Sequence, residues 1–162
     1  MRHMSYSILL IEDNPVFSEM MGLLLSSIQT LSIELSIATN LASGLNATQT
    51  NTVDLIFLDY FLPDSRGAHS IQSIRKKAPH IPIIVLTGLD DYQAAIRSIK
   101  AGAEDYLIKG KFNVETLTRS ISHAIERHAH RAELEQENKH LKNLILLESD
   151  DLDSNEEMNH IW

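Results

Sequence analysis

Acidic, hydroxyl and lysine side chains follow the apolar runs of this sequence at four separate places. The groups that end these runs are Glu12 with Asp13, Asp59, Thr87 and Lys109. Buried parallel strands read as continuous apolar runs, and open α/β sheets bind ligands outside the carboxyl ends of their strands. We therefore expect these five side chains to converge on one crevice.

The chemistry of such a crevice follows from its donor atoms. Clustered carboxylates repel one another, so a nearby cation is needed to keep them ionised. Oxygen ligands without histidine or cysteine favour a hard ion such as Mg²⁺. Lys109 adds a mobile positive charge and Thr87 a hydroxyl donor, and both suit the oxygens of a phosphoryl group. Because the Asp59 carboxylate is a competent nucleophile, the residues alone indicate a phosphoryl-accepting aspartate site.

Five strand-like runs must position these side chains, and helix-like stretches separate them. The expected strands are 7–11, 33–38, 54–58, 82–87 and 104–108, and the expected helices begin after residues 14, 40, 67, 91 and 113. Asn14 and Asn40 suit the N-caps of the first two helices, and Gly102 suits the end of the fourth. Strands that alternate with helices predict an α/β doubly wound domain with a parallel sheet, over about residues 5–128. Spacing alone leaves two common strand orders open.

Together these motifs resemble the receiver domains of two-component response regulators. The resemblance covers residues 7–128 and rests on Glu12-Asp13, on Asp59 with Leu62-Pro63-Asp64 and Gly67, on Thr87-Gly88, and on Gly102 to Lys109. It implies a flavodoxin-like, five-stranded parallel sheet with strand order 2-1-3-4-5. It also implies a histidine kinase or phosphotransfer protein as the phosphoryl donor.

The resemblance assigns a role to each residue of the metal and acceptor site. Asp59 would be the phosphoacceptor. Asp13, Asp59 and the Phe61 carbonyl would bind Mg²⁺, and Glu12 would act mostly through metal-bound water. Asp64 is expected to be a turn residue rather than a metal ligand, since Pro63 precedes it and Gly67 follows three residues later.

The resemblance further implies a phosphate-binding set and a switch. Thr87, Gly88 and Lys109 would contact the phosphoryl oxygens. Tyr106 would turn inward when Thr87 moves, and the signal would leave through the face made by the fourth helix, the fifth strand and the fifth helix. Gly110 departs from the family pattern, which has a cis proline after the lysine, and glycine disfavours a cis bond.

The fifth helix has no stop signal, since neither glycine nor proline occurs between Arg127 and Leu147. Within it Leu134, Asn138, Leu141 and Ile145 follow the 4-3-4 spacing of a coiled coil, with Asn138 at an a-like position. Two good heptads are fewer than a firm assignment needs, so a partly solvated helix stays open beside a homodimer. We expect a receiver domain over 5–128, a helical extension over 129–148, and an acidic disordered tail over 149–162.

Charge and composition narrow the function classes. Residues 1–132 hold 13 acidic and 12 basic residues, whereas residues 133–162 hold 9 acidic and 2 basic ones. This distribution argues against a nucleic-acid surface, which needs clustered lysine and arginine. There is no apolar run long enough to span a bilayer, and the absence of cysteine fits a cytoplasmic protein.

The leading interpretation is a phosphorylation-controlled switch, not a turnover enzyme beyond self-phosphorylation and slow self-dephosphorylation. A second interpretation is a truncated receiver from a larger protein with a cyclase, PAS, kinase or phosphatase output. A distant third is an aspartate-nucleophile phosphatase of the haloacid dehalogenase type. That class needs an aspartic acid two residues after the nucleophile, where this sequence has Phe61.

Overall fold

The computed structural model describes residues 5–88 and 91–158, with side chains described as far as Leu147. The strands are β1 (Ser5–Ile11), β2 (Ser32–Ala38), β3 (Leu55–Asp59), β4 (Ile83–Thr87) and β5 (Asp105–Ile108). The helices are α1 (Pro15–Ser26), α2 (Leu41–Thr50), α3 (Gly67–Lys77), α4 (Tyr92–Lys100) and α5 (Val114–Met158). Every expected strand and helix is therefore present.

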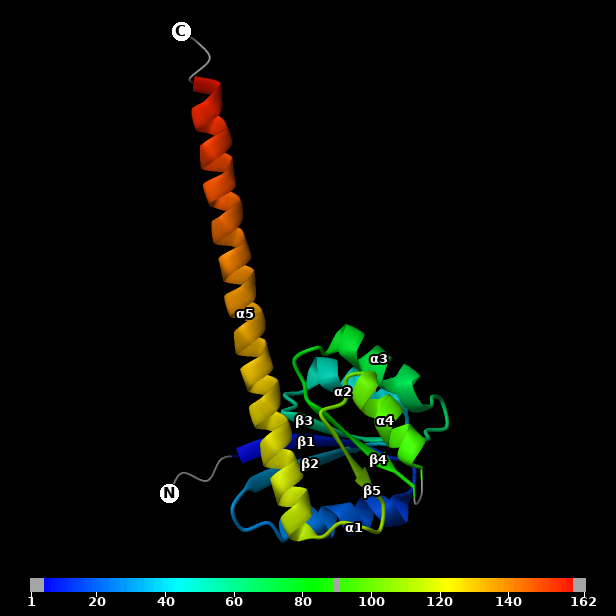
Figure 1. Cartoon of the computed structure of the whole chain (residues 1–162). Coiled ribbons are helices and arrows are strands. Elements are labelled where there is room, and N and C mark those ends of the chain that lie inside the picture. The colour runs from blue at the N-terminus through cyan, green and yellow to red at the C-terminus, as the bar shows by residue number, and fades with distance from the viewer. Residues whose placement is uncertain (1–4, 89–90, 159–162) are drawn as a thin grey trace. The chain divides into compact units, whose positions relative to one another are not determined.

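All five strands are parallel and lie in the order β2-β1-β3-β4-β5, which confirms the flavodoxin-like α/β fold (Figure 1). The register pairs Ile11 with Leu58, Asp59 with Leu86, and Thr87 with Ile108. The carboxyl ends of four neighbouring strands consequently lie at one edge of the sheet. This alignment is what brings Glu12, Asp59, Thr87 and Lys109 to the same edge.

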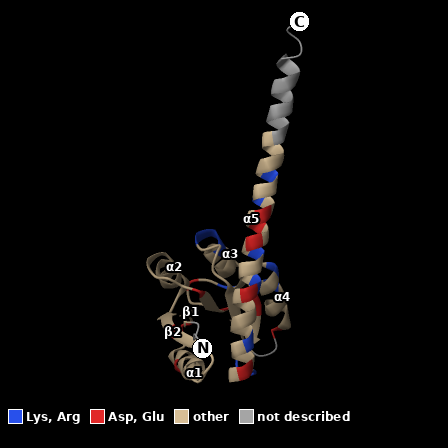
Figure 2. Ribbon diagram, turned by 90° about the vertical axis from the view of Figure 1, so that its left-hand side faces the viewer, with Lys and Arg blue, Asp and Glu red and all other residues tan. Residues whose placement is uncertain are grey.

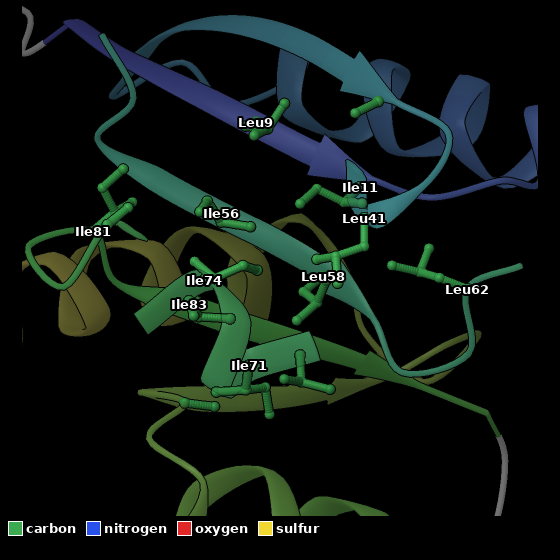
Figure 3. Close-up of a cluster of buried hydrophobic side chains, with 14 of the residues drawn as sticks. Leu9, Ile11, Leu41, Ile56, Leu58, Leu62, Ile71, Ile74, Ile81 and Ile83 are labelled. Carbon is green, nitrogen blue, oxygen red and sulfur yellow. The ribbon is translucent and has the colours of Figure 1, made fainter. Parts of the chain in front are cut away.

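Helices α2, α3 and α4 cover one face of the sheet (Figure 1). Figure 3 shows the apolar layer beneath them, in which Leu41, Ile71 and Ile74 from the helices lie among Leu9, Ile56, Leu58 and Ile83 from the strands. Ile71 and Ile74 are fully buried, and burial of such a side chain contributes about 1.5–3 kcal/mol. These two residues therefore hold α3, and the loop that precedes it, against β3.

Helix α1 and the first turns of α5 cover the other face. The helix side chains of this second layer are Met21, Leu25, Leu117, Ile121 and Ala124, and the strand side chains are Ile8, Leu10, Leu55, Phe57, Ile84, Leu86 and Leu107. β3, β4 and the second half of β1 are thus buried on both faces, which explains why they read as continuous apolar runs.

Polar residues fix the helix ends as the sequence predicts. The Asn14 side chain accepts hydrogen bonds from the N–H groups of Val16 and Phe17, with Pro15 in the first turn. Asn40 accepts a hydrogen bond from the Ser43 N–H in the same way. Gly102 follows α4 with a φ of +110°, a conformation that glycine adopts readily.

The structure divides into two compact units, Met1–His128 and Ala129–Trp162. The α5 backbone is helical to Met158, and neither glycine nor proline interrupts it. Asp, Ser and Asn, which favour helices only weakly, make up most of residues 149–158. The disordered tail expected over 149–162 stays a prediction. Residues 159–162 lie outside the described residues. In the described part of the chain, no helix has the length and apolar character needed to cross a membrane.

Candidate functional site

The ammonium group of Lys109 lies between two carboxylates at the carboxyl edge of the sheet. Its Nζ is 2.6 Å from Glu12 Oε2 and 3.3 Å from Asp59 Oδ2. Glu12 is 1% exposed and Asp59 is 5% exposed, so both acids are buried. Two buried carboxylates facing one lysine leave the pocket with excess negative charge.

Backbone amides hold these two carboxylates in place. The Asn14 N–H donates to Glu12 Oε1 at 3.0 Å, and the Phe61 N–H donates to Asp59 Oδ1 at 3.2 Å. One oxygen of each acid is therefore fixed by the chain, and the other faces Lys109. Both acids directly follow or end a buried strand, which is why their position depends on the sheet and not on a flexible loop.

Lys109 is positioned by β4 and by an aromatic ring. Its backbone N–H donates to the Thr87 carbonyl at 2.8 Å, which continues the pairing of β5 with β4. Its Nζ lies 4.4 Å from the centre of the Phe17 ring, a cation–π contact with α1. Nothing in the local sequence around Phe17 signals this contact, because the two residues are far apart in the chain.

The effects of burial and of neighbouring groups on the Glu12 carboxyl do not cancel. Burial raises the pKa of the Glu12 carboxyl above its ordinary value, and the charge of Asp59 adds to the rise. The hydrogen bonds from Lys109 and the Asn14 amide act in the opposite direction. The net shift is upward, so the ionised form of Glu12 is under-compensated by the protein alone.

Three of the predicted metal ligands form a cluster. Carboxylate oxygens of Glu12, Asp13 and Asp59 lie within 4.8 Å of one another. Glu12 and Asp59 are buried and Asp13 is exposed, so the cluster opens toward solvent on one side. The donor set consists of oxygen atoms, which suits a hard divalent cation, and the excess negative charge is of the sign that such a cation offsets. The pocket could therefore hold a metal ion.

Thr87 carries a buried hydroxyl group that makes no hydrogen bond to any of the described residues. The residue is 1% exposed, and Thr87 Oγ1 and Ser18 Oγ are the buried side-chain polar atoms of the described residues without a partner. A buried hydroxyl without a partner costs roughly 1–3 kcal/mol. At Gly88, which follows, a Cβ would meet no atom of the described residues within 4 Å.

The remaining predicted site residues lie close by in the chain. Phe61 is 51% exposed and supplies no acid, so the phosphatase interpretation gains no support at that position. Tyr106 of β5 is half-buried and packs against the layer beneath α2, α3 and α4. The Lys109–Gly110 bond is trans, and Gly110 has a φ of +81°, so glycine here provides a left-handed turn.

Two contacts near the site were not foreseen. Asp64 accepts hydrogen bonds from the N–H groups of Leu41 at 2.8 Å and Ala42 at 3.0 Å, so it caps α2 from the loop after β3. Arg97 Nε of α4 donates to the Tyr60 hydroxyl oxygen at 3.3 Å. Both join segments far apart in the sequence, which is why local patterns did not reveal them.

Comparison with known proteins agrees with this geometry. The response regulator receiver domain family matches residues 8–122. The chain belongs to this family. The receiver is 31% identical over 128 residues to the transcriptional regulatory protein BasR of Escherichia coli, covering 79% of this chain and 56% of that protein. It is 30% identical over 122 residues to a cyclic di-GMP phosphodiesterase of Thermotoga maritima, covering 74% of this chain and 31% of that protein.

Solved structures give the same result for the fold. A response regulator receiver domain protein of Clostridium thermocellum matches the receiver with a TM-score of 0.66 and 31% identity, covering 75% of this chain and 95% of that one. The signal receiver domain of an HD domain-containing protein of Pseudomonas fluorescens Pf-5 matches with a TM-score of 0.67 and 25% identity, covering 80% of this chain and 99% of that one. The chain spans about half the length of the first curated relatives it matches.

Proposed function

We propose that this chain is a phosphorylation-dependent response regulator switch in which Asp59 accepts a phosphoryl group. The observation that carries the proposal is the arrangement around Asp59, a buried carboxylate with Lys109 at 3.3 Å and two further acids beside it. Response regulators interact with histidine kinases, so the donor is a phosphohistidine of such a kinase or of a phosphotransfer protein.

In the transfer step an Asp59 carboxylate oxygen attacks the phosphorus atom of the donor. The new bond is an acyl phosphate O–P bond, the P–N bond of the phosphohistidine breaks, and the electron pair of that bond stays on the donor imidazole. Lys109 supports the step because its charge lies next to the oxygen that faces away from the Phe61 amide. As the phosphoryl oxygens arrive, they compete with Glu12 for the same ammonium group.

The acidic cluster supports a requirement for Mg²⁺. The side chains of Glu12, Asp13 and Asp59 and the Phe61 carbonyl would hold it, with Glu12 acting mostly through water. When bound, Mg²⁺ offsets the negative charge of the phosphoryl oxygens and of the carboxylates. Burial is the main cause of the raised pKa of Glu12, and a cation bound beside it would favour its ionised form.

The Thr87 hydroxyl and one hydrogen bond of α4 support a route from Asp59 to the face made by α4, β5 and α5. The unpartnered Thr87 hydroxyl can donate to a phosphoryl oxygen. Tyr106 lies on the neighbouring strand, where it would turn inward when Thr87 moves. The Arg97–Tyr60 hydrogen bond gives α4 a second connection, to the residue that directly follows Asp59. Through α5 the signal would reach the helical extension.

The test is phosphorylation by a small phosphoryl donor such as acetyl phosphate, with and without Mg²⁺. Intact mass spectrometry should show one added phosphoryl group only with Mg²⁺, and hydroxylamine should remove it as expected for an acyl phosphate. Asp59→Asn should abolish the addition, whereas the matched variant Asp54→Asn, at a residue outside the acidic cluster, should retain it. Addition that persists in Asp59→Asn would refute the proposal.

A further inference from the structure

Large apolar side chains are exposed along one side of α5 beyond the receiver. Leu134 is 46% exposed, Leu141 is 50% exposed and Ile145 is 65% exposed. Together with Asn138 they recur at intervals of four, three and four residues, which places them in one stripe. We propose that this stripe binds the same stripe of a second copy of the chain, with the two α5 helices parallel and in register.

Asn138 selects the parallel arrangement. In a parallel, in-register pair the two copies of Asn138 face each other, and each amide supplies the donor or acceptor that the other needs. In an antiparallel pair an a-position faces a d-position, so Asn138 would lie against a leucine with its amide unpaired. Burial of an unpaired amide is unfavourable, so the apolar residues and Asn138 are satisfied together only in the parallel pair.

The charges beside the stripe favour the same arrangement. Acidic and basic residues are interspersed along the described side chains of α5 (Figure 2). In a parallel pair, a residue that precedes an a-position faces the residue five positions later in the other copy. Glu137 of one copy therefore faces Lys142 of the other. This pairing is of the attractive kind, and symmetry repeats it.

A second copy of the chain also meets the requirements for a partner of this stripe. A partner for this stripe must offer apolar residues at coiled-coil spacing, one amide opposite Asn138, and a lysine opposite Glu137. The chain carries all three in the matching order. Leu144, Leu146 and Leu147, which are 45%, 62% and 63% exposed, lie outside the four-residue stripe. A buried asparagine at an a-position favours two strands, so the proposal is a dimer and not a larger bundle.

Single cysteine variants test the geometry directly, because the natural sequence contains no cysteine. Leu134→Cys and Ile145→Cys should each form a disulfide-linked dimer under mild oxidation, whereas Gln136→Cys, on the opposite side of α5, should not. Positions 134 and 145 are about 16 Å apart along the helix, so an antiparallel pair can bring at most one of them against its own copy. Cross-linking at only one of them, at neither, or equally at all three would overturn the proposal.

Charge reversal provides an independent measurement. Lys142→Glu and Glu137→Lys should each weaken dimerisation by roughly three- to tenfold, measured as the dimer dissociation constant by sedimentation equilibrium. The double reversal should restore most of the affinity. Equal loss in the single and double variants, or a mass above that of a dimer for the unmodified chain, would contradict parallel two-stranded pairing.

The pairing extends the proposed function, in which α5 carries the output, and the two can fail separately. Cross-linking is measured at rest and with Mg²⁺ and beryllofluoride, a mimic of the phosphoryl group, while phosphorylation of Asp59 is read by intact mass. Cross-links at 134 and 145 in either condition support the pairing, and their absence in both refutes it. Cross-links without phosphorylation would support the pairing and refute the proposed function. Phosphorylation of Asp59 without cross-links would support the proposed function and refute the pairing.

Discussion

Lys109 Nζ lies 2.6 Å from Glu12 Oε2, so the lysine of the resting site is held by a buried acid beside the nucleophile. The contact gives Glu12 the positive charge that burial demands, and it keeps Lys109 next to Asp59. Phosphoryl transfer, in the proposed function, requires the lysine to share its charge with new oxygens. The stability of the pocket and its readiness to accept a phosphoryl group are therefore linked through one side chain.

Lys109→Met removes this charge and keeps most of the apolar stem. Without Mg²⁺ we expect the free energy of unfolding at pH 7 to fall by roughly 1–3 kcal/mol, because a buried carboxylate loses its charged hydrogen-bond partner. The deficit should shrink as pH falls through the raised pKa of Glu12, where the carboxyl becomes neutral. Urea denaturation with and without Mg²⁺ measures both effects, and Mg²⁺ should stabilise the variant more than the natural protein.

Lys111→Met is the matched control for this variant. It removes a lysine two residues away, outside the ion pairs with Glu12 and Asp59, and Lys76→Met, at an exposed position on α3, is the second control. We expect the unfolding free energy of each control to change by less than about 0.5 kcal/mol. An equal loss in Lys109→Met and in the controls would mean that Lys109 acts through general charge and not through its contact with Glu12.

Thr87→Val replaces the unpartnered hydroxyl with a methyl group of similar shape. Because the hydroxyl makes no hydrogen bond in the resting protein, we expect the unfolding free energy to stay the same or rise by about 1 kcal/mol. The response to Mg²⁺ and beryllofluoride, measured as the shift in melting temperature, should nevertheless decrease. Ser18→Ala removes the other unpartnered hydroxyl and should leave that response unchanged. A large loss of resting stability in Thr87→Val would show that the hydroxyl has a partner.

Asp64 gives a pH-dependent prediction. Burial acts to raise its pKa, but the hydrogen bonds from the Leu41 and Ala42 amides prevail, and the pKa lies below its ordinary value of 3.8. A lowered pKa stabilises the fold above the ordinary value, and this contribution is lost as pH falls through the folded value. Asp64→Ala should therefore cost about 1 kcal/mol at neutral pH and less in acid. Urea denaturation across the acid range checks this, and a cost that is independent of pH would contradict the capping role.

Gly67 lies where the loop after the site enters α3, with a φ of +56°. A Cβ at this position would lie 2.8 Å from Cζ and the hydroxyl oxygen of Tyr60. Gly67→Ala should therefore lower the unfolding free energy by roughly 2 kcal/mol, from the left-handed backbone and from the displaced ring. At Gly22, inside α1, a Cβ would lie 3.8 Å from Leu35 Cδ2, an ordinary contact. Gly22→Ala should instead raise the unfolding free energy by about 0.5–1 kcal/mol. Chemical denaturation compares the two, and a gain in both would contradict the crowding at Tyr60.

The sequence sufficed for the five strands and the five helices, because apolar runs and helix caps are local signals, whereas the strand order was implied by the resemblance to receiver domains. Apolar runs locate the strands, and a polar residue after a run locates the carboxyl edge, as at Asp59. Contacts between distant segments were beyond such rules, and the cap that Asp64 provides for α2 is one example. The end of α5 was open to two interpretations, since an acidic segment after Glu148 suits a disordered tail and a helix equally well when no glycine or proline decides.

The sheet has two free edges, and their strands affect how copies of this protein can meet. β2 carries Glu34 at an exposed position, and β5 is four residues long and begins with Asp105. Short edge strands and edge carboxylates discourage strand-to-strand addition, which is the common route to uncontrolled aggregation. Copies brought close together through their helices would therefore keep their sheets apart. An assembly held at one end of the chain can then raise the local concentration of receivers without converting them into fibrils.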